Sequence, residues 1–260
     1  MSPLGLPLNQ GEINNALAKS YWRVIVVEET GSTQTDLSND ARAGKAKHGD
    51  VLVTEYQSAG RGRLDRRFDA PPRSSLLFSF FIVPQSDAGE WGWLPLLAGQ
   101  SVISAMKNVF GLEITARLSL KWPNDVLLND KKVAGILSER VQDGVLIGIG
   151  LNVITPREDI AFQNATSLWI EGFILTERAA LLIEILKSFA KCLSDWEKKE
   201  ADFLAEYRVV SSTIGKRVRI ETPSGHSVEE NAVDVDSSGA LVLSDGTRVT
   251  VGDIVHLRQL

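Results

Sequence analysis

The segment "KWPNDVLLNDKKVAGILSE", residues 121–139, places polar residues around a turn between strand-forming runs. Lys121 lies at the end of one predicted strand, and Pro123 restricts the backbone of the turn that follows. Asn124 and Asp125 can bond to the local backbone or face a ligand. The segment therefore predicts a strand, a turn and further strands. Its polar residues fit either a ligand site or a plain hairpin with solvated lysines.

Lys132 lies at the start of the next predicted strand, which runs into Gly135. Because glycine has no side chain, another group can come close to the backbone at that point. The run "VLIGIGLNVI", residues 145–154, is predicted to pair with this strand through a turn near residue 143. These segments together predict consecutive hairpins in the middle of the chain.

Further strands and helices are predicted on both sides of these hairpins. We expect strands at 22–29, 50–57 and 74–83, and helices at 13–20, 31–44, 91–111 and 176–207. The last helix has the most regular apolar spacing, because leucine, isoleucine and aromatic residues recur every three to four positions. Hairpins mixed with helices, without a regular βαβ alternation, predict an α+β fold.

The residue pattern of the sequence changes after residue 212. Short β-rich runs are broken by "PSGH", "SSG" and "SDG", which predicts a small barrel of four or five strands. We therefore expect two domains, a catalytic domain at 1–212 and a barrel domain at 213–260. The barrel region has five Lys and Arg against seven Asp and Glu, so it does not look like a nucleic-acid module.

Composition restricts the classes of partner. The chain has 260 residues and a net charge of −5, which disfavours DNA and anionic membranes as partners. A single cysteine, the absence of a signal-like start and the lack of a long apolar run favour a cytoplasmic protein. The sequence contains neither a phosphate loop nor a spaced set of metal ligands, so no metal is fixed by a motif.

The stretch "GRGRLDRRF", residues 60–68, concentrates positive charge in an acidic chain. In an extended backbone, Arg61 and Arg63 would point to the same side and form a fork for a carboxylate or phosphate. Gly62 between them would let the backbone approach a ligand, and Phe68 offers a flat face for a base. A solvated basic loop explains the same residues equally well.

Two further segments carry small polar residues beside glycines. The segment "ETGSTQTD", residues 29–36, presents Ser32, Thr33 and Gln34 where a strand passes into a helix, and these residues fit either a polar ring or a helix cap. In the run "IGIGLNV", two glycines leave one face of the strand bare, which suits a flat ligand or close strand packing.

In this order, the segments "GSTQTDL", "EYQSAGRGR", "KWPNDVLLNDKKVAGIL" and "IGIGLNV" closely resemble the biotin protein ligase family. The resemblance covers roughly residues 22–258. It implies a mixed-sheet catalytic domain of the biotin/lipoate ligase type followed by a small SH3-like β-barrel. It also implies an enzyme that makes biotinyl-5′-AMP from biotin, ATP and Mg²⁺ and then transfers biotin to a lysine. That lysine lies in the biotin carboxyl carrier domain of a carboxylase.

The resemblance also implies roles for individual residues. Those matching biotin-binding positions are Ser32, Thr33, Gln34, Gln57, Arg61, Gly62, Arg63 and Lys132, with Lys132, Arg61 and Arg63 as the catalytic cations. Those matching the ATP or adenylate side are Arg66, Phe68, Lys121, Asn124 and Asn152. Asp125 is expected near the incoming carrier lysine or the metal.

The sequence departs from the family pattern at three positions. Asp65 stands where a third glycine is usual, and Phe68 stands where tryptophan is usual. A negative charge beside the phosphate site and a smaller stacking surface predict weaker ATP binding or slower loop closure. Gln34 stands where asparagine is common, which makes that biotin contact one methylene longer.

The roughly 20 residues before the first predicted strand are too few for the DNA-binding domain of family members that are also repressors. The resemblance therefore implies a monofunctional ligase, as a monomer or weak homodimer. Two alternatives stay open, a lipoate or octanoate ligase and a non-catalytic sensor of biotin or its adenylate. The "KWPND" and "GRGR" segments favour biotin over the first alternative, and the retained cations disfavour the second.

Overall fold

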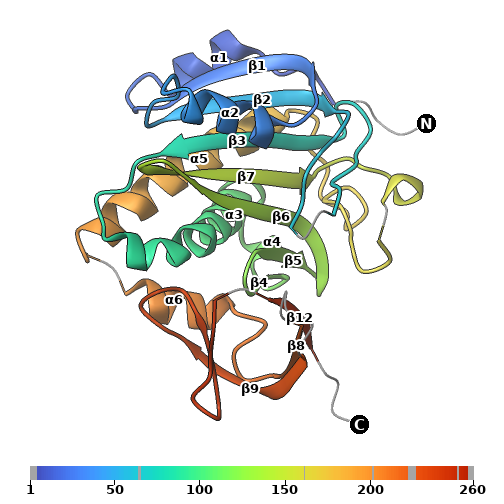
Figure 1. The fold of residues 1–260 in the computed structure, drawn as a ribbon. Helices are drawn as coiled ribbons and strands as arrows, with labels where there is room; N and C mark the ends of the chain where they lie inside the picture. Colours follow the sequence, from blue (N-terminus) through green and yellow to red (C-terminus); the bar gives the residue numbers. More distant parts are fainter. Residues whose placement is uncertain are drawn as a thin grey trace.

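A mixed seven-stranded sheet forms the centre of the molecule (Figure 1). The computed structural model describes residues 5–63, 66–160, 162–200, 202–221, 227–250 and 252–256. The sheet order is β1-β2-β3-β7-β6-β5-β4. The strands are β1 (Arg23–Thr30), β2 (Asp50–Gln57), β3 (Ser75–Ile82), β4 (Leu118–Lys121), β5 (Asp125–Leu128), β6 (Lys131–Val141) and β7 (Gly144–Asn152). Strands β1 and β2 pair in parallel, and the other pairs of this sheet are antiparallel.

Helices cover both faces of this sheet because its central strands are apolar on both sides. All eight residues of β3 are buried. Phe78 and Phe80 face α3 (Leu94–Phe110) and α5 (Arg178–Glu197), which lie behind the sheet in Figure 1. Phe81 faces the opposite way and packs with Leu37 of α2 (Thr33–Arg42). The alternation of side chains along β3 therefore separates the two helical layers.

The remaining helices are short. They are α1 (Gln10–Ala16), α4 (Leu112–Thr115), α6 (Phe203–Val210) and the 3₁₀ helices η1 (Ala88–Trp93) and η2 (Arg157–Asp159). Among the described residues, none of the helices is both long and apolar enough to cross a lipid bilayer.

The helix predicted at 176–207 is wrong in its length, because the chain forms α5 and α6 with a break between them. Lys199 takes a left-handed conformation with φ of 57°, which ends the first helix. Asp202 then accepts a hydrogen bond from the Ala205 N–H at 3.0 Å and caps the second. Residues 197–202 are Glu, Lys, Lys, Glu, Ala and Asp, so the apolar spacing is interrupted at the break.

A second, antiparallel sheet follows α6. Its order is β11-β10-β9-β8-β12. The strands are β8 (Arg217–Glu221), β9 (Ser227–Val235), β10 (Leu241–Leu243), β11 (Arg248–Val249) and β12 (Asp253–His256). The small β-rich unit expected after residue 212 is therefore present. Its closure into an SH3-like barrel and the domain boundary at residue 212 stay predictions.

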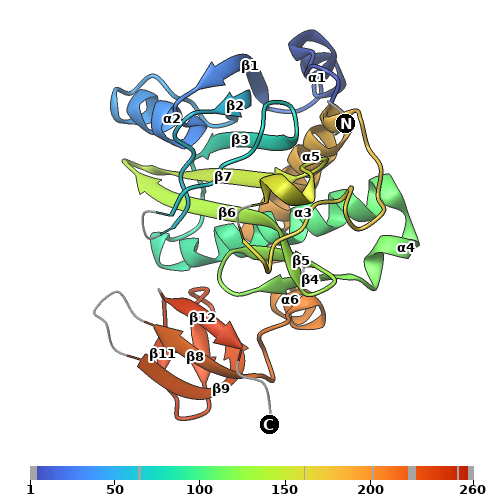
Figure 2. The same cartoon turned by 90° about the vertical axis from the view of Figure 1, so that its right-hand side faces the viewer.

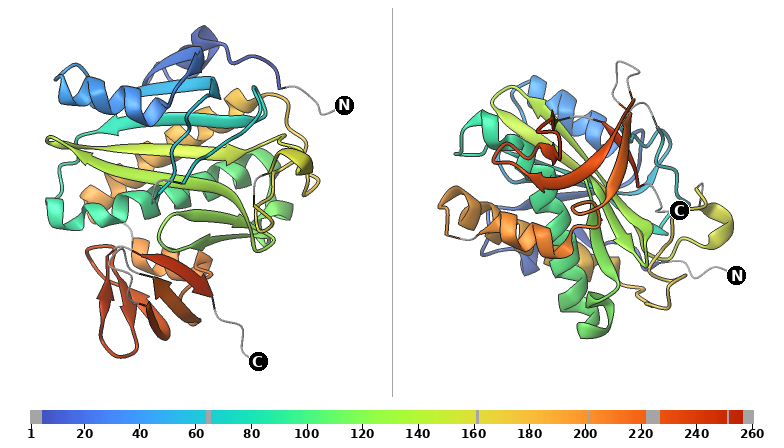
Figure 3. Two further views of the ribbon diagram at one scale, coloured as in Figure 1. Left: turned by 45° about the vertical axis from the view of Figure 1, so that its right-hand side comes forward. Right: turned by 90° about the horizontal axis from the view of Figure 1, so that it is seen from below.

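The C-terminal sheet lies below the larger sheet, beside the β4–β5 hairpin (Figures 2 and 3). Two tryptophans of the larger unit donate to its backbone. Trp93 Nε1 donates to Asp236 O at 2.9 Å, and Trp122 Nε1 donates to Gly239 O at 3.0 Å. Because both indole groups are buried, these hydrogen bonds fix the two sheets against each other.

His256 of β12 is partly buried at this junction. We therefore expect the protein to lose stability in mild acid. Its Nε2 lies 3.2 Å from Thr213 Oγ1, which accepts a hydrogen bond from the Trp122 N–H at 3.0 Å. Burial, followed by the charges of Lys121 and Lys216, lowers the pKa of His256 to about 4. Between pH 6.5 and 4 the unfolded chain therefore binds a proton that the folded chain does not, so folding stability decreases as the pH is lowered through this interval.

We expect His256→Gln to flatten this dependence. Because the imidazole is only partly buried, the effect should be about 1 kcal/mol over the interval. Thermal unfolding of both proteins from pH 7 to pH 4 measures the difference. Parallel melting curves for the two proteins would contradict the assignment to His256.

Candidate functional site

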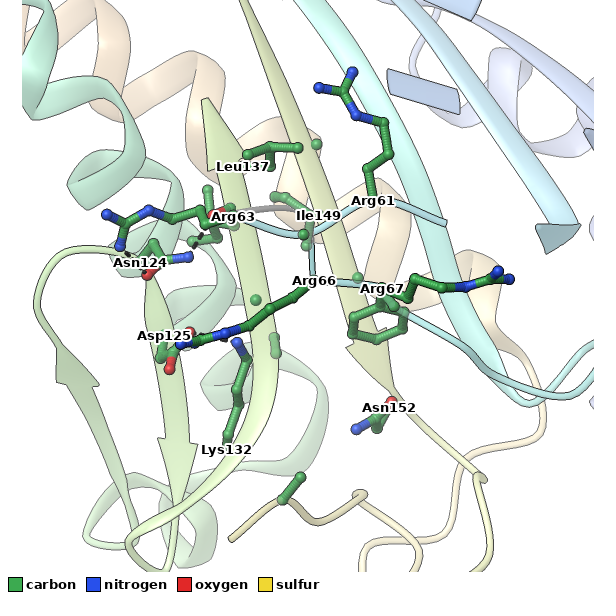
Figure 4. A pocket seen from close by; sticks show the side chains of 18 of the residues that line it. Arg61, Arg63, Arg66, Arg67, Asn124, Asp125, Lys132, Leu137, Ile149 and Asn152 are labelled. Carbon is green, nitrogen blue, oxygen red and sulfur yellow. Dashed lines mark hydrogen bonds and ion pairs between the residues drawn. The ribbon is translucent and has the colours of Figure 1, made fainter. Parts of the chain in front are cut away.

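One pocket of about 520 Å³ opens on the face of β6 and β7 (Figure 4). Its walls come from the N-terminus of α2, the 60–68 stretch, the turn between β4 and β5, and the segment after β7. The residues that the sequence predicted for the site all line it: Ser32, Thr33, Gln34, Gln57, Arg61, Gly62, Arg63, Arg66, Phe68, Lys121, Asn124, Asp125, Lys132 and Asn152. Residues 120 positions apart thus meet around one cavity.

The N-terminus of α2 forms the end of the pocket nearest β2 and β3. Ser32 is the N-cap of the helix, and its hydroxyl faces the Thr35 N–H at 3.5 Å. Thr33 donates through its N–H to Gln57 Oε1 at 2.8 Å, and its hydroxyl lies 2.9 Å from Ser79 Oγ. The helix start is therefore a cap and also part of the pocket wall, and its binding of a polar ring stays a prediction.

Gln34 differs from its neighbours because its amide has no protein partner. The side chain is 3% exposed, and neither Nε2 nor Oε1 has a hydrogen-bond partner among the described residues. It lies against Gly148, where an added Cβ would stand 2.6 Å from Gln34 Oε1. A buried amide without partners is costly unless a ligand satisfies it. Gln34 thus offers both a donor and an acceptor to a bound molecule.

The glycines of β7 therefore leave space for side chains of the protein as well as for the pocket. A Cβ on Gly150 would lie 2.8 Å from the Phe68 ring. The expectation that this strand leaves a bare face for a flat ligand is thus corrected, since Gln34 and Phe68 lie on it. Their ring and amide, rather than the strand itself, present the surface to a ligand.

The 60–68 stretch is a narrow hairpin rather than an extended loop. The Gly62 N–H donates to Arg66 O at 2.7 Å, and the Phe68 N–H donates to Gly60 O at 3.1 Å. An added Cβ on Gly60 would stand 2.1 Å from the Phe68 carbonyl oxygen, so the close approach of the two arms requires glycine there. Leu64 and Asp65 lie outside the described residues.

The predicted fork of Arg61 and Arg63 is wrong. Arg61 points toward Glu139 of β6, with Nη1 3.7 Å from Oε2. Arg63 points the other way and donates to Asn124 Oδ1 and to Gly252 O, both at 3.1 Å (Figure 4). The fork assumed an extended chain, whereas the hairpin fold turns the two side chains to opposite sides of the pocket.

Asn124 holds the turn between β4 and β5 in place through hydrogen bonds. Its Nδ2 donates to Ile136 O at 2.8 Å, and its carbonyl oxygen accepts from the Ile136 N–H at 2.9 Å. Its Oδ1 is left for Arg63. The Pro-Asn-Asp turn is therefore tied both to β6 and to the arginine hairpin.

Lys132 and Asp125 form an ion pair at the floor of the pocket. Lys132 Nζ lies 2.6 Å from Asp125 Oδ1, and the two side chains are 33% and 21% exposed. The lysine lies alongside Gly135, where an added Cβ would be 3.0 Å from Nζ. The close approach expected at Gly135 is thus made by the chain's own lysine. A ligand anion entering the pocket meets an amino group that Asp125 already holds in position.

The wall formed by the segment after β7 was not predicted from the sequence. Thr155, Asp159, Ile160, Phe162, Asn164 and Ala165 line the pocket, as do Glu221 and Ile254 of the C-terminal sheet. The Lys132 N–H donates to Asn164 O, and the Thr166 N–H donates to Lys132 O, each at 2.8 Å. The segment therefore holds the backbone of Lys132 from the side. Phe162, an exposed aromatic in a polar stretch, was the one available signal.

Comparison with known proteins places this site in a family. The family model described as "Biotin/lipoate A/B protein ligase family" matches residues 25–153. A biotin–[acetyl-CoA-carboxylase] ligase of Mycobacterium tuberculosis is 39% identical over 259 residues, covering 97% of both chains. The bifunctional ligase/repressor BirA of Escherichia coli is 32% identical over 78% of this chain and 64% of its own.

Solved structures agree with the sequence relatives. The biotin protein ligase of Aquifex aeolicus in complex with biotin and ATP superposes with a TM-score of 0.75 at 27% identity, covering 91% of this chain and 99% of that one. The biotin protein ligase of Leishmania major in complex with biotinyl-5-AMP gives a TM-score of 0.62 at 25% identity. The near full-length match, the mixed sheet and the shared motifs lead to one conclusion: this chain belongs to the biotin protein ligases of the biotin/lipoate A/B protein ligase family.

Proposed function

We propose that this chain is an ATP-dependent biotin protein ligase. It forms biotinyl-5′-AMP from biotin and MgATP, and then transfers biotin to a lysine of the biotin carboxyl carrier domain of a carboxylase. The observation that carries the proposal is the single pocket in which a buried, unpartnered amide lies at one end and a cluster of cations at the other. Biotin has a polar ureido ring at one end and a carboxylate at the other.

The biotin ring is assigned to the α2 end of the pocket. A ureido group carries two N–H donors and one carbonyl acceptor. An amide side chain can accept a hydrogen bond from the first kind of group and donate one to the second. Gln34 has both atoms available, while Ser32, Thr33 and Gln57 surround it with hydroxyl and amide groups. This end also favours biotin over lipoate, whose dithiolane ring would leave the amide unpaired.

The carboxylate and the α-phosphate are assigned to Lys132 and the arginine hairpin. In the first step the biotin carboxylate attacks the α-phosphorus, a bond to phosphorus forms, and pyrophosphate leaves. Both reactants are anions, so the barrier falls when fixed cations stand between them. Lys132 lies beside Asp125, and an incoming carboxylate or phosphate exchanges with that partner. Arg63 supplies a second cation from the hairpin.

The nucleotide is assigned to the opposite side of the pocket. Phe68, lying on Gly150, provides a flat face for the adenine, and Arg66, Lys121 and Asn152 line the same region. Among the described residues no group of three or more acidic, histidine or cysteine side chains is placed to hold a metal ion. Mg²⁺ is therefore expected to arrive with ATP and to be held mainly by its phosphates.

In the second step a carrier lysine attacks the carbonyl of the mixed anhydride and AMP leaves. The attacking amine must be neutral, and Asp125 lies where it can accept a hydrogen bond from that amine once Lys132 has turned to the substrate. The C-terminal unit, proposed as an SH3-like barrel domain from residue 213, brings Ile254 to the pocket rim. The cytoplasmic location and the monomeric or weakly dimeric state stay predictions from the sequence.

A transfer assay tests the proposal. The protein is mixed with biotin, MgATP and an isolated carrier domain, and the carrier is weighed by mass spectrometry. We expect a gain of one biotin, and parallel reactions with lipoate or octanoate should give none. A carrier known to accept biotin that stays unmodified would overturn the proposal, and would leave the sensor alternative. Transfer of lipoate would favour the second family activity.

Asp65 gives a separate prediction, based on the sequence alone. We expect Asp65→Gly to lower the KM for ATP or to raise the rate of adenylate formation, because it removes a negative charge near the phosphate site and frees the hairpin tip. A pyrophosphate-release assay at varied ATP measures both quantities. Unchanged values would show that this departure from the family pattern is neutral.

A further inference from the structure

Glu139 of β6 joins three parts of the molecule that surround the pocket, although it does not line the pocket itself. Its Oε1 accepts from Arg42 Nη2 at 2.8 Å and from Ser38 Oγ at 3.3 Å, and both of these residues belong to α2. Its Oε2 faces Arg61 Nη1 at 3.7 Å. The same helix presents Gln34 to the pocket. One carboxylate thus connects the helix at the α2 end with the arginine hairpin.

The hairpin is held at two points on opposite sides of the pocket. Arg61 reaches Glu139 on one side, while Arg63 reaches Asn124 and Gly252 on the other (Figure 4). Between these anchors the backbone crosses the pocket, and Arg61 and Arg67 form a β-bridge that keeps the two arms together. Each anchor uses one of the two arginines for which a fork had been expected.

We propose, on the basis of the proposed biotin ligase function, that Glu139 is a positioning residue that holds the hairpin across the biotin pocket by fixing Arg61 to α2. Glu139 touches neither substrate and acts through Arg61. The carboxylate is held in place by Arg42 and Ser38, so it offers Arg61 a fixed partner rather than a freely rotating one. Retention of biotin and its adenylate should therefore depend on the charge of Glu139.

Glu139→Gln tests this, because it keeps the shape of the side chain and removes the charge. Since partly exposed ion pairs contribute modestly, we expect the KM for biotin to rise about three- to five-fold, with the KM for ATP and kcat changed less than two-fold. Trypsin should cut the hairpin faster by a similar factor. A lower biotin KM would overturn the proposal, because it would mean that the pair holds Arg61 away from the substrate.

The chain offers a matched control. The Arg23–Asp50 pair joins two side chains that are 50% and 27% exposed, close to the 48% and 24% of Arg61 and Glu139. It lies away from the pocket, so Asp50→Asn should leave the biotin KM and the cutting of the hairpin unchanged. If both variants raise the biotin KM equally, the effect is general and Glu139 has no positioning role.

A double-variant cycle separates positioning from a structural effect on α2. With Arg61→Gln in place, Glu139→Gln should have no further effect on the biotin KM, because the group through which it acts is gone. With Arg42→Gln in place, Glu139→Gln should still raise it. Additive effects of Glu139→Gln and Arg61→Gln on the biotin KM would contradict the proposal, even if both proteins fold with normal melting temperatures.

Discussion

Lys132→Ala is expected to lower the rate of biotinyl-5′-AMP formation by about 10³-fold while leaving the fold intact. The loss follows from the removal of a fixed cation at the point where a carboxylate and a phosphate must meet. The substitution also leaves Asp125 without the partner that lies 2.6 Å away, so less of its negative charge is compensated at the point where the two anions react. Pyrophosphate release measures the first step directly.

Lys131→Ala is the matched control. Lys131 precedes Lys132 on β6, but its Nζ lies 3.5 Å from Glu171 Oε1, outside the residues that line the pocket. We expect its adenylation rate to stay within about two-fold of the parent protein, because an exposed ion pair contributes little to the fold. Full activity of Lys132→Ala, or an equal loss in both variants, would remove Lys132 from its assigned role.

Measuring the two partial reactions separately makes this test more specific. Biotinyl-5′-AMP made by chemical synthesis can be supplied to Lys132→Ala together with the carrier domain. If Lys132 serves mainly the attack on the α-phosphorus, transfer from the supplied adenylate should be reduced far less than adenylate formation. Equal losses in the two steps would mean that Lys132 stabilises the bound adenylate itself.

The strands could be predicted from the sequence because their signals are local. The run 50–57 is rich in β-branched and apolar residues and follows a glycine, and the structure has β2 at those residues. The break between α5 and α6 could not be predicted in the same way. It depends on the left-handed conformation of Lys199, which lies in a run of glutamate and lysine, residue types that also favour a helix.

The pocket residues could be predicted because they match the motifs of the biotin protein ligase family. The directions in which their side chains point could not be predicted. Arg61 and Arg63 diverge because a hairpin replaces an extended chain, and this depends on contacts between Gly60 and Phe68. Glu139 carries no local signal at all, since a single glutamate on a half-buried strand usually faces solvent. Its importance depends on α2 and the hairpin, which lie at least 70 positions away.

Gln34→Leu is expected to separate stability from binding. In the ligand-free protein it replaces a buried amide without protein partners by an apolar group of similar size. The free energy of unfolding should therefore rise by about 1 kcal/mol. Biotin should bind about 100-fold more weakly, because two groups of its ureido ring would lose their partners in a buried site. Thermal unfolding and isothermal titration with biotin measure the two effects.

Gln100→Leu supplies the control within the same chain. Gln100 lies in α3, away from the residues that line the pocket, and its Oε1 is also buried without a partner among the described residues. The same substitution there should raise stability and leave biotin affinity unchanged. If Gln34→Leu instead lowers stability and keeps biotin affinity, its amide serves the fold. The ureido ring must then be recognised by Ser32, Thr33 and Gln57, whose polar groups are already partnered in part.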